Sequence, residues 1–396
     1  MRPGTQGFAG MRLREAREAR GLTAVALADF VGVTRAAVSQ YERDGQSPSP
    51  PVMSRISECL NLPVQFFLRE RATPDIGTVF YRSMSAATKR ARQAAERRYV
   101  WLQDIAQLLA DYVHFPDVLF PTFELPDDPA KIHDNLIEDL ATQTRRYWGL
   151  SDGPISNVSW LLENSGAIVT RCELGAATLD AFSEWRLHDG RPFIFLNSDK
   201  ASAVRSRFDA AHELGHMVLH RHLPKNVIQK TELFGLVEAQ AHLFAGAFLM
   251  PSASFSSSIY SLTLDGFCSL KQTWGVSIGA MIRRAAQLGL VSEAFERRLW
   301  RNMARRKWRT CEPLDDTLPP EEPKFLRRSI EMLIGQGLFA PNELSVRLSL
   351  SCDDIEELTG LVAGYLSKAG PEIELRDAKP TAGTAGTRTF RFPSTN

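Results

Sequence analysis

The residues best suited to chemistry are two histidines and a glutamate in the pentapeptide His-Glu-Leu-Gly-His, residues 212–216. The apolar spacing around this pentapeptide predicts a helix over residues 202–220. On a helix, His212 and His216 lie one turn apart on the same face, so both imidazoles can bind one Zn²⁺. Glu213 is then placed to act as a general acid and base on water at the metal.

A catalytic zinc ion takes three protein ligands and keeps one position open for water. The pattern His-Glu-x-x-His-x-x-Gly-x-x-His would supply His222, but Leu219 stands where that pattern needs a glycine to turn the chain. A glutamate from a following helix is the alternative, and Glu238 fits, with His242 one turn later. We favour Glu238, and we then expect His220 and His222 at the surface or at the end of the helix.

Three short runs of β-branched and aromatic residues precede this helix, at residues 167–172, 181–185 and 192–196. They predict a small sheet. An edge strand of such a sheet can pair with an extended peptide substrate, and residues 193–197 are our candidate for that edge. Their apolar character equally allows an ordinary core strand. The expected fold is therefore mainly α with a small β-sheet, of the α+β class, with a zincin-like peptidase domain.

The N-terminal segment predicts short helices over residues 12–20, 24–30 and 35–41, with Thr23 and Thr34 as N-caps. We expect the charged residues of the first helix to face outward. The second and third helices form a helix-turn-helix, an arrangement whose second helix fits a major groove of DNA. Its candidate DNA-contacting residues are Thr34, Arg35, Ala36, Ser39 and Gln40.

A basic segment runs from Arg82 to Arg98, with six basic residues against Glu96 alone. It is either a phosphate-binding surface beside the helix-turn-helix or the solvated face of a connecting helix. An apolar stripe at helical spacing follows, and it either packs on the next domain or forms a dimer seam. The stripe comprises Val100, Leu102, Ile105, Leu108, Leu109 and Tyr112.

The C-terminal third is predicted to be helical. Residues 271–289 read as helix, turn and helix packed on the peptidase domain. Residues 297–309 hold seven basic residues among Trp300, Met303 and Trp308, and we favour a helix with a buried tryptophan stripe over a second phosphate-binding surface.

The domain organisation follows from these patterns and from shifts in composition. The expected boundaries are 1–72 for the helix-turn-helix domain, 73–133 for the connecting helix, 134–310 for the peptidase domain, 311–369 for a helical module, and 370–396 for a disordered tail.

Composition narrows the class of protein. Lys and Arg number 47 against 46 Asp and Glu, so any attraction to nucleic acid must come from local patches. The longest uncharged stretch, residues 239–264, contains Pro251 and several serines, which excludes a membrane span. No apolar signal segment opens the chain, and the five cysteines are scattered and odd in number. We expect a cytoplasmic protein with no membrane partner.

Residues 12–68 resemble the Cro/XRE family of helix-turn-helix domains. The resemblance rests on Gly-Leu-Thr at 21–23, Val-Ser-Gln-Tyr-Glu-Arg-Asp-Gly at 38–45 and Leu-Asn-Leu-Pro at 60–63. Ala24 replaces the phosphate-binding glutamine that the family usually carries just inside the second helix. The resemblance implies binding to a double-stranded DNA operator, and we expect a homodimer.

Residues 207–220 and 238–251 resemble the ImmA/IrrE family of zinc metallopeptidases. The resemblance implies a gluzincin-like endopeptidase in which His212, His216 and Glu238 bind zinc and Glu213 is the catalytic acid and base. His242 replaces the Asn or Asp of relatives, as a partner of a ligand or as a ligand itself.

The whole chain is therefore expected to be a DNA-binding transcriptional regulator that cleaves a protein, typically a repressor, in a stress or mobile-element response. The alternative is a zinc-containing domain that senses a ligand or partner without cleavage and controls the helix-turn-helix.

Overall fold

The structure is a computed structural model that describes residues 4–69, 79–81, 89–173, 181–186, 188–198, 203–223 and 231–367. It is mainly helical with one small sheet, as the sequence predicts. The predicted disordered tail at 370–396 and the first part of the basic segment, residues 82–88, lie outside the described residues.

The N-terminal helices form the predicted helix-turn-helix. Thr23 accepts a hydrogen bond from the Ala26 amide at 3.1 Å, and Thr34 accepts one from the Ala37 amide at 3.1 Å, so both predicted N-caps are confirmed. Gly32 ends the second helix in the left-handed region at φ 71°, which glycine adopts without steric cost. The elements are α1 (Gly10–Ala19), α2 (Ala24–Val31), α3 (Arg35–Tyr41), α4 (Pro50–Leu60) and α5 (Val64–Leu68).

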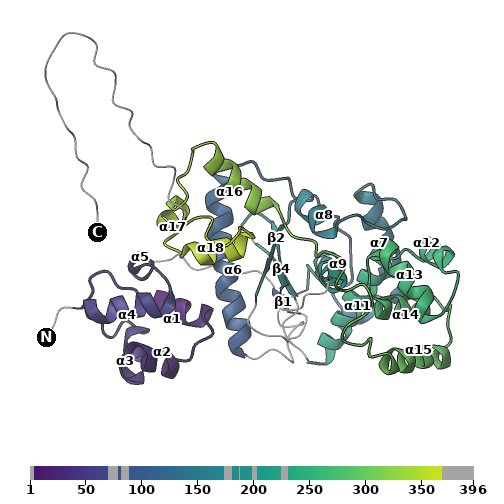
Figure 1. The fold of residues 1–396 in the computed structure, drawn as a ribbon, viewed down its shortest axis with the longest axis horizontal. Coiled ribbons are helices and arrows are strands. Elements are labelled where there is room, and N and C mark those ends of the chain that lie inside the picture. The colour runs from purple at the N-terminus through teal and green to yellow at the C-terminus, as the bar shows by residue number, and fades with distance from the viewer. Residues whose placement is uncertain are drawn as a thin grey trace, which may run out of the picture.

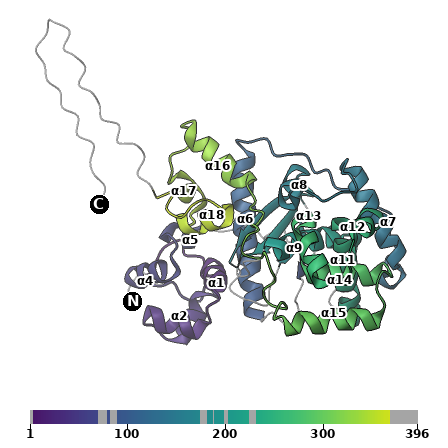
Figure 2. The same ribbon diagram turned by 45° about the vertical axis from the view of Figure 1, so that its right-hand side comes forward.

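The long helix α6 (Lys89–Ala110) lies between the N-terminal helices and the rest of the protein (Figures 1 and 2). Val100, Leu102, Ile105 and Leu109 on its apolar stripe are at most 1% exposed. They belong to one core shared by the N-terminal helices, the sheet and the C-terminal helices. The stripe therefore packs inside the chain, and the dimer-seam interpretation of it is wrong.

Three charged residues of α1, Arg12, Glu15 and Glu18, face inward, contrary to the prediction. Glu15 accepts a hydrogen bond from the indole nitrogen of Trp101 on α6 at 2.7 Å, and Arg12 Nη1 lies 2.6 Å from the same carboxylate. Glu18 forms an ion pair with Arg97 of α6 at 2.9 Å. Burial is tolerated because each of these carboxylates has a partner.

Two arginines in the basic half of α6 also form ion pairs within the chain. Arg97 pairs with Glu18, and Arg98 pairs with Glu357 near the C-terminus at 2.7 Å. Neither arginine matches the solvated-face or the phosphate-binding interpretation. The two ion pairs attach the helix-turn-helix and the C-terminal helices to the same scaffold helix.

The sheet has the strand order β1-β3-β4-β2. β2 (Ile168–Cys172) and β4 (Pro192–Asn197) are parallel, while β3 (Ala181–Trp185) is antiparallel to β4 and to β1 (Val79–Tyr81). β4 therefore has a neighbour on both sides, and the prediction that residues 193–197 form a free edge is wrong. Its burial agrees with a central position, because every residue of β4 is buried.

The helices of the peptidase region surround a second core. Among the helices, α11 has its most extensive contacts with α9 and α7. Trp274, Ile278 and Met281 are at most 3% exposed, which confirms that residues 271–289 pack on this region. The helices are α7 (Asp134–Tyr147), α8 (Val158–Asn164), α9 (Ala203–Leu219), α11 (Thr231–Leu249), α12 (Ser252–Ser258), α13 (Leu264–Trp274), α14 (Ile278–Gln287) and α15 (Glu293–Arg305).

The C-terminal helices α16 (Phe325–Gly335), α17 (Glu343–Leu348) and α18 (Cys352–Thr359) cover α6 and the outer side of β2. The Thr170 hydroxyl of β2 donates to the Leu358 carbonyl at 2.7 Å. Asp354 of α18 forms an ion pair with Arg20 at the end of α1 at 2.5 Å. The C-terminal helices thus contact both the DNA-binding region and the sheet.

Among the described residues, no single helix has the length and apolar character to cross a membrane. Only the pair Glu232–Leu249 and Ser252–Ser258, bent by 64°, reaches that length and composition when its two helices are taken together.

Candidate metal centre and DNA-binding face

The centre is built where α9 and α11 come into close contact. Gly215 lies in the pentapeptide on α9, and a Cβ at this position would be 3.0 Å from the carbonyl oxygen of Ala241 on α11. A side chain here would push the two backbones apart. Glycine at this point therefore lets α11 bring its polar residues up to the two histidines of α9.

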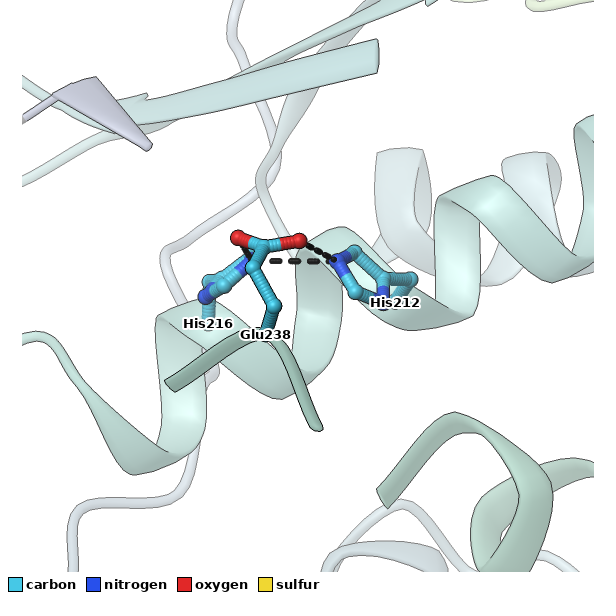
Figure 3. Close-up of side chains that lie close together, drawn as sticks. All are labelled: His212, His216 and Glu238. Carbon is cyan, nitrogen blue, oxygen red and sulfur yellow. Dashed lines mark hydrogen bonds and ion pairs between the residues drawn. The ribbon is translucent and has the colours of Figure 1, made fainter. Parts of the chain in front are cut away.

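Two imidazoles and a carboxylate converge at this contact (Figure 3). The Nε2 atoms of His212 and His216 are 3.1 Å apart. The Glu238 carboxylate faces both rings, with one oxygen 3.3 Å from His212 Nε2 and the other 3.2 Å from His216 Nε2. The structure thus brings together three of the residues singled out from the sequence.

The spacing of these atoms fits a tetrahedral metal. Metal–ligand bonds of about 2.0–2.1 Å place neighbouring ligand atoms roughly 3.3–3.4 Å apart in a tetrahedron. The three observed separations, 3.1, 3.2 and 3.3 Å, need little adjustment to reach those values. Two imidazoles and one carboxylate are also a donor set typical of catalytic zinc.

His220 follows the last residue of α9, so it lies at the helix end as expected, but it is fully buried and not at the surface. Its Nδ1 lies 3.1 Å from Nδ1 of His216, and its Nε2 lies 3.1 Å from the Gln240 side-chain oxygen. Burial, followed by the neighbouring His216, lowers the pKa of His220 well below its usual value. A neutral His220 can hold the ring of His216 with its Nε2 toward Glu238.

Gln240 is in turn fixed by the backbone of the segment before α7. Its amide nitrogen donates to the carbonyl oxygens of Pro129 at 2.7 Å and Ile132 at 2.8 Å. These bonds orient its side-chain oxygen toward His220. A continuous series of contacts therefore links this segment through Gln240 and His220 to His216.

The remaining predicted residues occupy distinct places around the centre. Glu213 is fully buried on α9, next to His212 in the sequence. The ring of His242 lies 5.4 Å from that of His212 and 4.8 Å from that of Phe208, outside the convergent group. His222 is exposed and its Nε2 lies 3.0 Å from the Pro126 carbonyl, so it does not join the group.

The predicted DNA-binding face is open to solvent. Thr34, Arg35, Ala36 and Gln40 are exposed and Ser39 is half-buried, whereas Val38 and Tyr41 pack inward. In Figure 1, α3 lies on the part of the N-terminal bundle away from the C-terminal helices. The helix can therefore approach a groove without rearrangement of the bundle.

Comparison with known proteins agrees with both regions. Residues 13–67 match a helix-turn-helix family model, and residues 162–286 match a peptidase family model described as the IrrE N-terminal-like domain. The chain joins an XRE-type helix-turn-helix to an IrrE/ImmA-like peptidase domain. The latter match includes all the residues that converge at the metal centre, which supports a metallopeptidase type for this domain.

A stretch of 76 residues is 37% identical to the HTH-type transcriptional regulator PrpR of Mycobacterium tuberculosis. This similarity covers 18% of the chain and 16% of that relative. It agrees with a role as a DNA-binding transcription regulator.

Proposed function

We propose that this protein is a DNA-binding regulator with a zinc-dependent endopeptidase centre formed by His212, His216 and Glu238, with Glu213 as the catalytic acid and base. The observation that carries the proposal is the convergence of three ligand side chains in a domain that matches a peptidase family. Two imidazole nitrogens lie 3.1 Å apart, and each lies 3.2–3.3 Å from an oxygen of the Glu238 carboxylate. His242 lies beside the centre as a neighbour of the ligand His212.

When bound, zinc would polarise a peptide carbonyl and lower the pKa of water at the open coordination position. The Glu213 carboxylate takes a proton from the attacking water and passes it to the nitrogen of the leaving amine. His220 and Gln240 keep the His216 ring oriented. Complete burial of His212, Glu213 and His216 limits exchange with bulk water around these groups.

The cleaved protein is proposed to be a repressor, so that cleavage derepresses genes in a stress or mobile-element response. The helix-turn-helix supplies recognition of a double-stranded operator through Thr34, Arg35, Ala36, Ser39 and Gln40. We also propose that the protein is a homodimer in the cytoplasm and that its domains have the boundaries expected above.

The decisive experiment compares the purified wild-type chain with single variants. We expect one Zn²⁺ per wild-type chain and loss of zinc in His212→Ala, His216→Ala and Glu238→Ala. Glu213→Gln is expected to keep zinc and abolish cleavage, because Glu213 is not a ligand in this proposal. Proteomics of cells that express either the wild type or Glu213→Gln identifies the protein that changes length. Unchanged zinc content in all three ligand variants would refute the site.

A second function is favoured by a separate cavity. An open pocket of about 850 Å³ lies where α1, α6, β2 and α18 meet, with Arg20, Arg98 and Glu357 among its lining residues. A ligand there would contact both the DNA-binding region and the peptidase sheet. In this alternative the protein senses a ligand without cleavage, and Glu213→Gln regulates its promoter like the wild type while no cellular protein changes length.

A further inference from the structure

A second cavity, of about 590 Å³, adjoins the metal centre. His242 belongs to its wall and also contacts the candidate ligand His212 through a ring-to-ring distance of 5.4 Å. Asp209 and Phe208 of α9 form part of the same wall. Because Asp209 lies one turn before Glu213 on α9, the cavity continues the surface that carries the centre.

The mouth of this cavity carries excess positive charge. Arg205, Arg283 and Arg309 line it, and the last two are exposed and form no ion pair with any residue that the structure describes. Arg205 donates to the carbonyl oxygens of residues 309 and 310, which keeps its guanidinium at the rim.

The acidic residues of the wall do not cancel these charges. Glu312 is already compensated, because Lys271 lies 3.0 Å from its carboxylate and the amides of Ile278 and Gly279 donate to it. Asp209 is the other carboxylate of the lining. Three arginines therefore line this cavity against two carboxylates, and one of these, Glu312, is compensated by Lys271.

Only part of the cavity wall is apolar, and an aromatic ring shapes this part. Met303 is 1% exposed, and Phe208 and Trp300 are buried or half-buried. Gly279 lets the Trp300 ring approach α14, since a Cβ there would be 3.1 Å from the ring. The exposed guanidinium groups at the rim match a carboxylate on a bound polypeptide, and the apolar part of the wall can contact the neighbouring carbon atoms.

We propose that this cavity binds an acidic side chain, Glu or Asp, of the polypeptide substrate beside the bond that is cut. The inference rests on the proposed function, because the bound polypeptide is a substrate only if the metal centre is a peptidase. Arg283 and Arg309 determine specificity, because their guanidinium groups can form charge-assisted hydrogen bonds with a carboxylate.

The test separates peptide binding from cleavage. The full chain carrying Glu213→Gln is applied to a peptide array in which one position is fixed as each amino acid in turn and the others are randomised. We expect Glu and Asp at one position to raise binding about fivefold to tenfold over Gln and Asn. Added Arg283→Glu or Arg309→Glu should remove this preference, and Arg301→Glu should leave it unchanged, because the exposed Arg301 of α15 lies outside the cavity lining.

The two proposals then fail in different ways. An array without acidic preference, or a preference that survives both Arg283→Glu and Arg309→Glu, overturns the acidic pocket. The wild-type chain is incubated in parallel with a proteome-derived peptide mixture, and cut sites are read by mass spectrometry. If nothing is cut while the array shows the arginine-dependent preference, the peptidase function fails and the pocket remains as a site for acidic peptides.

Discussion

Gly215 of α9 and Ala241 of α11 are held in direct contact, with room for no more than a hydrogen atom on the glycine. Gly215 lies between His212 and His216 in the sequence of α9, and Ala241 lies three residues after Glu238 on α11. The separation of the helices at this point therefore sets the distance from His212 and His216 to Glu238.

Gly215→Ala should accordingly weaken the metal centre. The added Cβ would meet the Ala241 carbonyl oxygen at 3.0 Å and must displace backbone rather than a flexible side chain. We expect a loss of roughly 1–3 kcal/mol in unfolding free energy from overpacking, partly offset by the better helix propensity of alanine. Zinc affinity should fall in the same variant, as measured by competition with a chelator.

Gly235→Ala on α11 is the matched control, because a Cβ at Gly235 would meet nothing within 4 Å. It should keep zinc affinity and raise helix stability by up to about 1 kcal/mol. Equal zinc affinity in the two alanine variants would contradict the role assigned to the Gly215 contact.

His220→Ala should lower zinc affinity by about 10–100-fold, the usual effect of removing a residue that orients a metal ligand. The reason is the 3.1 Å approach of its Nδ1 to Nδ1 of His216. His222→Ala, two residues away and exposed, should leave affinity unchanged. Chelator competition with both variants checks the difference, and equal behaviour of the two would exclude an orienting role for His220.

The local parts of the site were predictable from the sequence. Residues four apart on a helix share a face, so the pairing of His212 with His216 follows from spacing alone. The same rule applies to His216 and His220, but the apolar surroundings that bury His220 come from other segments. Its contact with Gln240 depends on carbonyl groups at Pro129 and Ile132, more than 100 residues earlier in the chain.

The long-range parts of the fold were not predictable in this way. The order of strands decides whether β4 is an edge, and β-propensity carries no information on that order. Glu15 and Glu18 look like exposed charges on an amphipathic helix. They are buried because Trp101 and Arg97 on a distant helix supply their partners.

Arg20→Ala should loosen the attachment of the helix-turn-helix to the C-terminal helices. Arg20 forms two bonds with Asp354, at 2.5 and 2.7 Å, and Asp354 is only 4% exposed. Removing the arginine leaves a buried carboxylate with fewer partners, which we expect to cost about 1–3 kcal/mol in chemical unfolding. Arg14→Ala is the control, since Arg14 is 55% exposed and its pair with Glu18 lies within α1.

The control should lose no more than about 0.5 kcal/mol, the usual value for a pair four residues apart on one helix, because Glu18 keeps its ion pair with Arg97. A double-mutant cycle with Asp354→Ala then isolates the coupling between the two residues. Additive effects of Arg20→Ala and Asp354→Ala would show that this ion pair does not hold the two regions together.

Arg35→Ala should weaken sequence-specific DNA binding by roughly 1–3 kcal/mol, because Arg35 is exposed at the start of α3, where a recognition helix meets base edges. The operator is first selected from random double-stranded DNA with the wild-type chain. Binding of the selected and a scrambled duplex is then compared at several salt concentrations. Loss confined to the selected duplex indicates contact with bases, whereas an equal loss on both, with a smaller salt slope, indicates contact with phosphates. If Arg35→Ala bound both duplexes as tightly as the wild type does, α3 would not be the recognition helix. Arg35 is the only basic side chain between Thr34 and Tyr41.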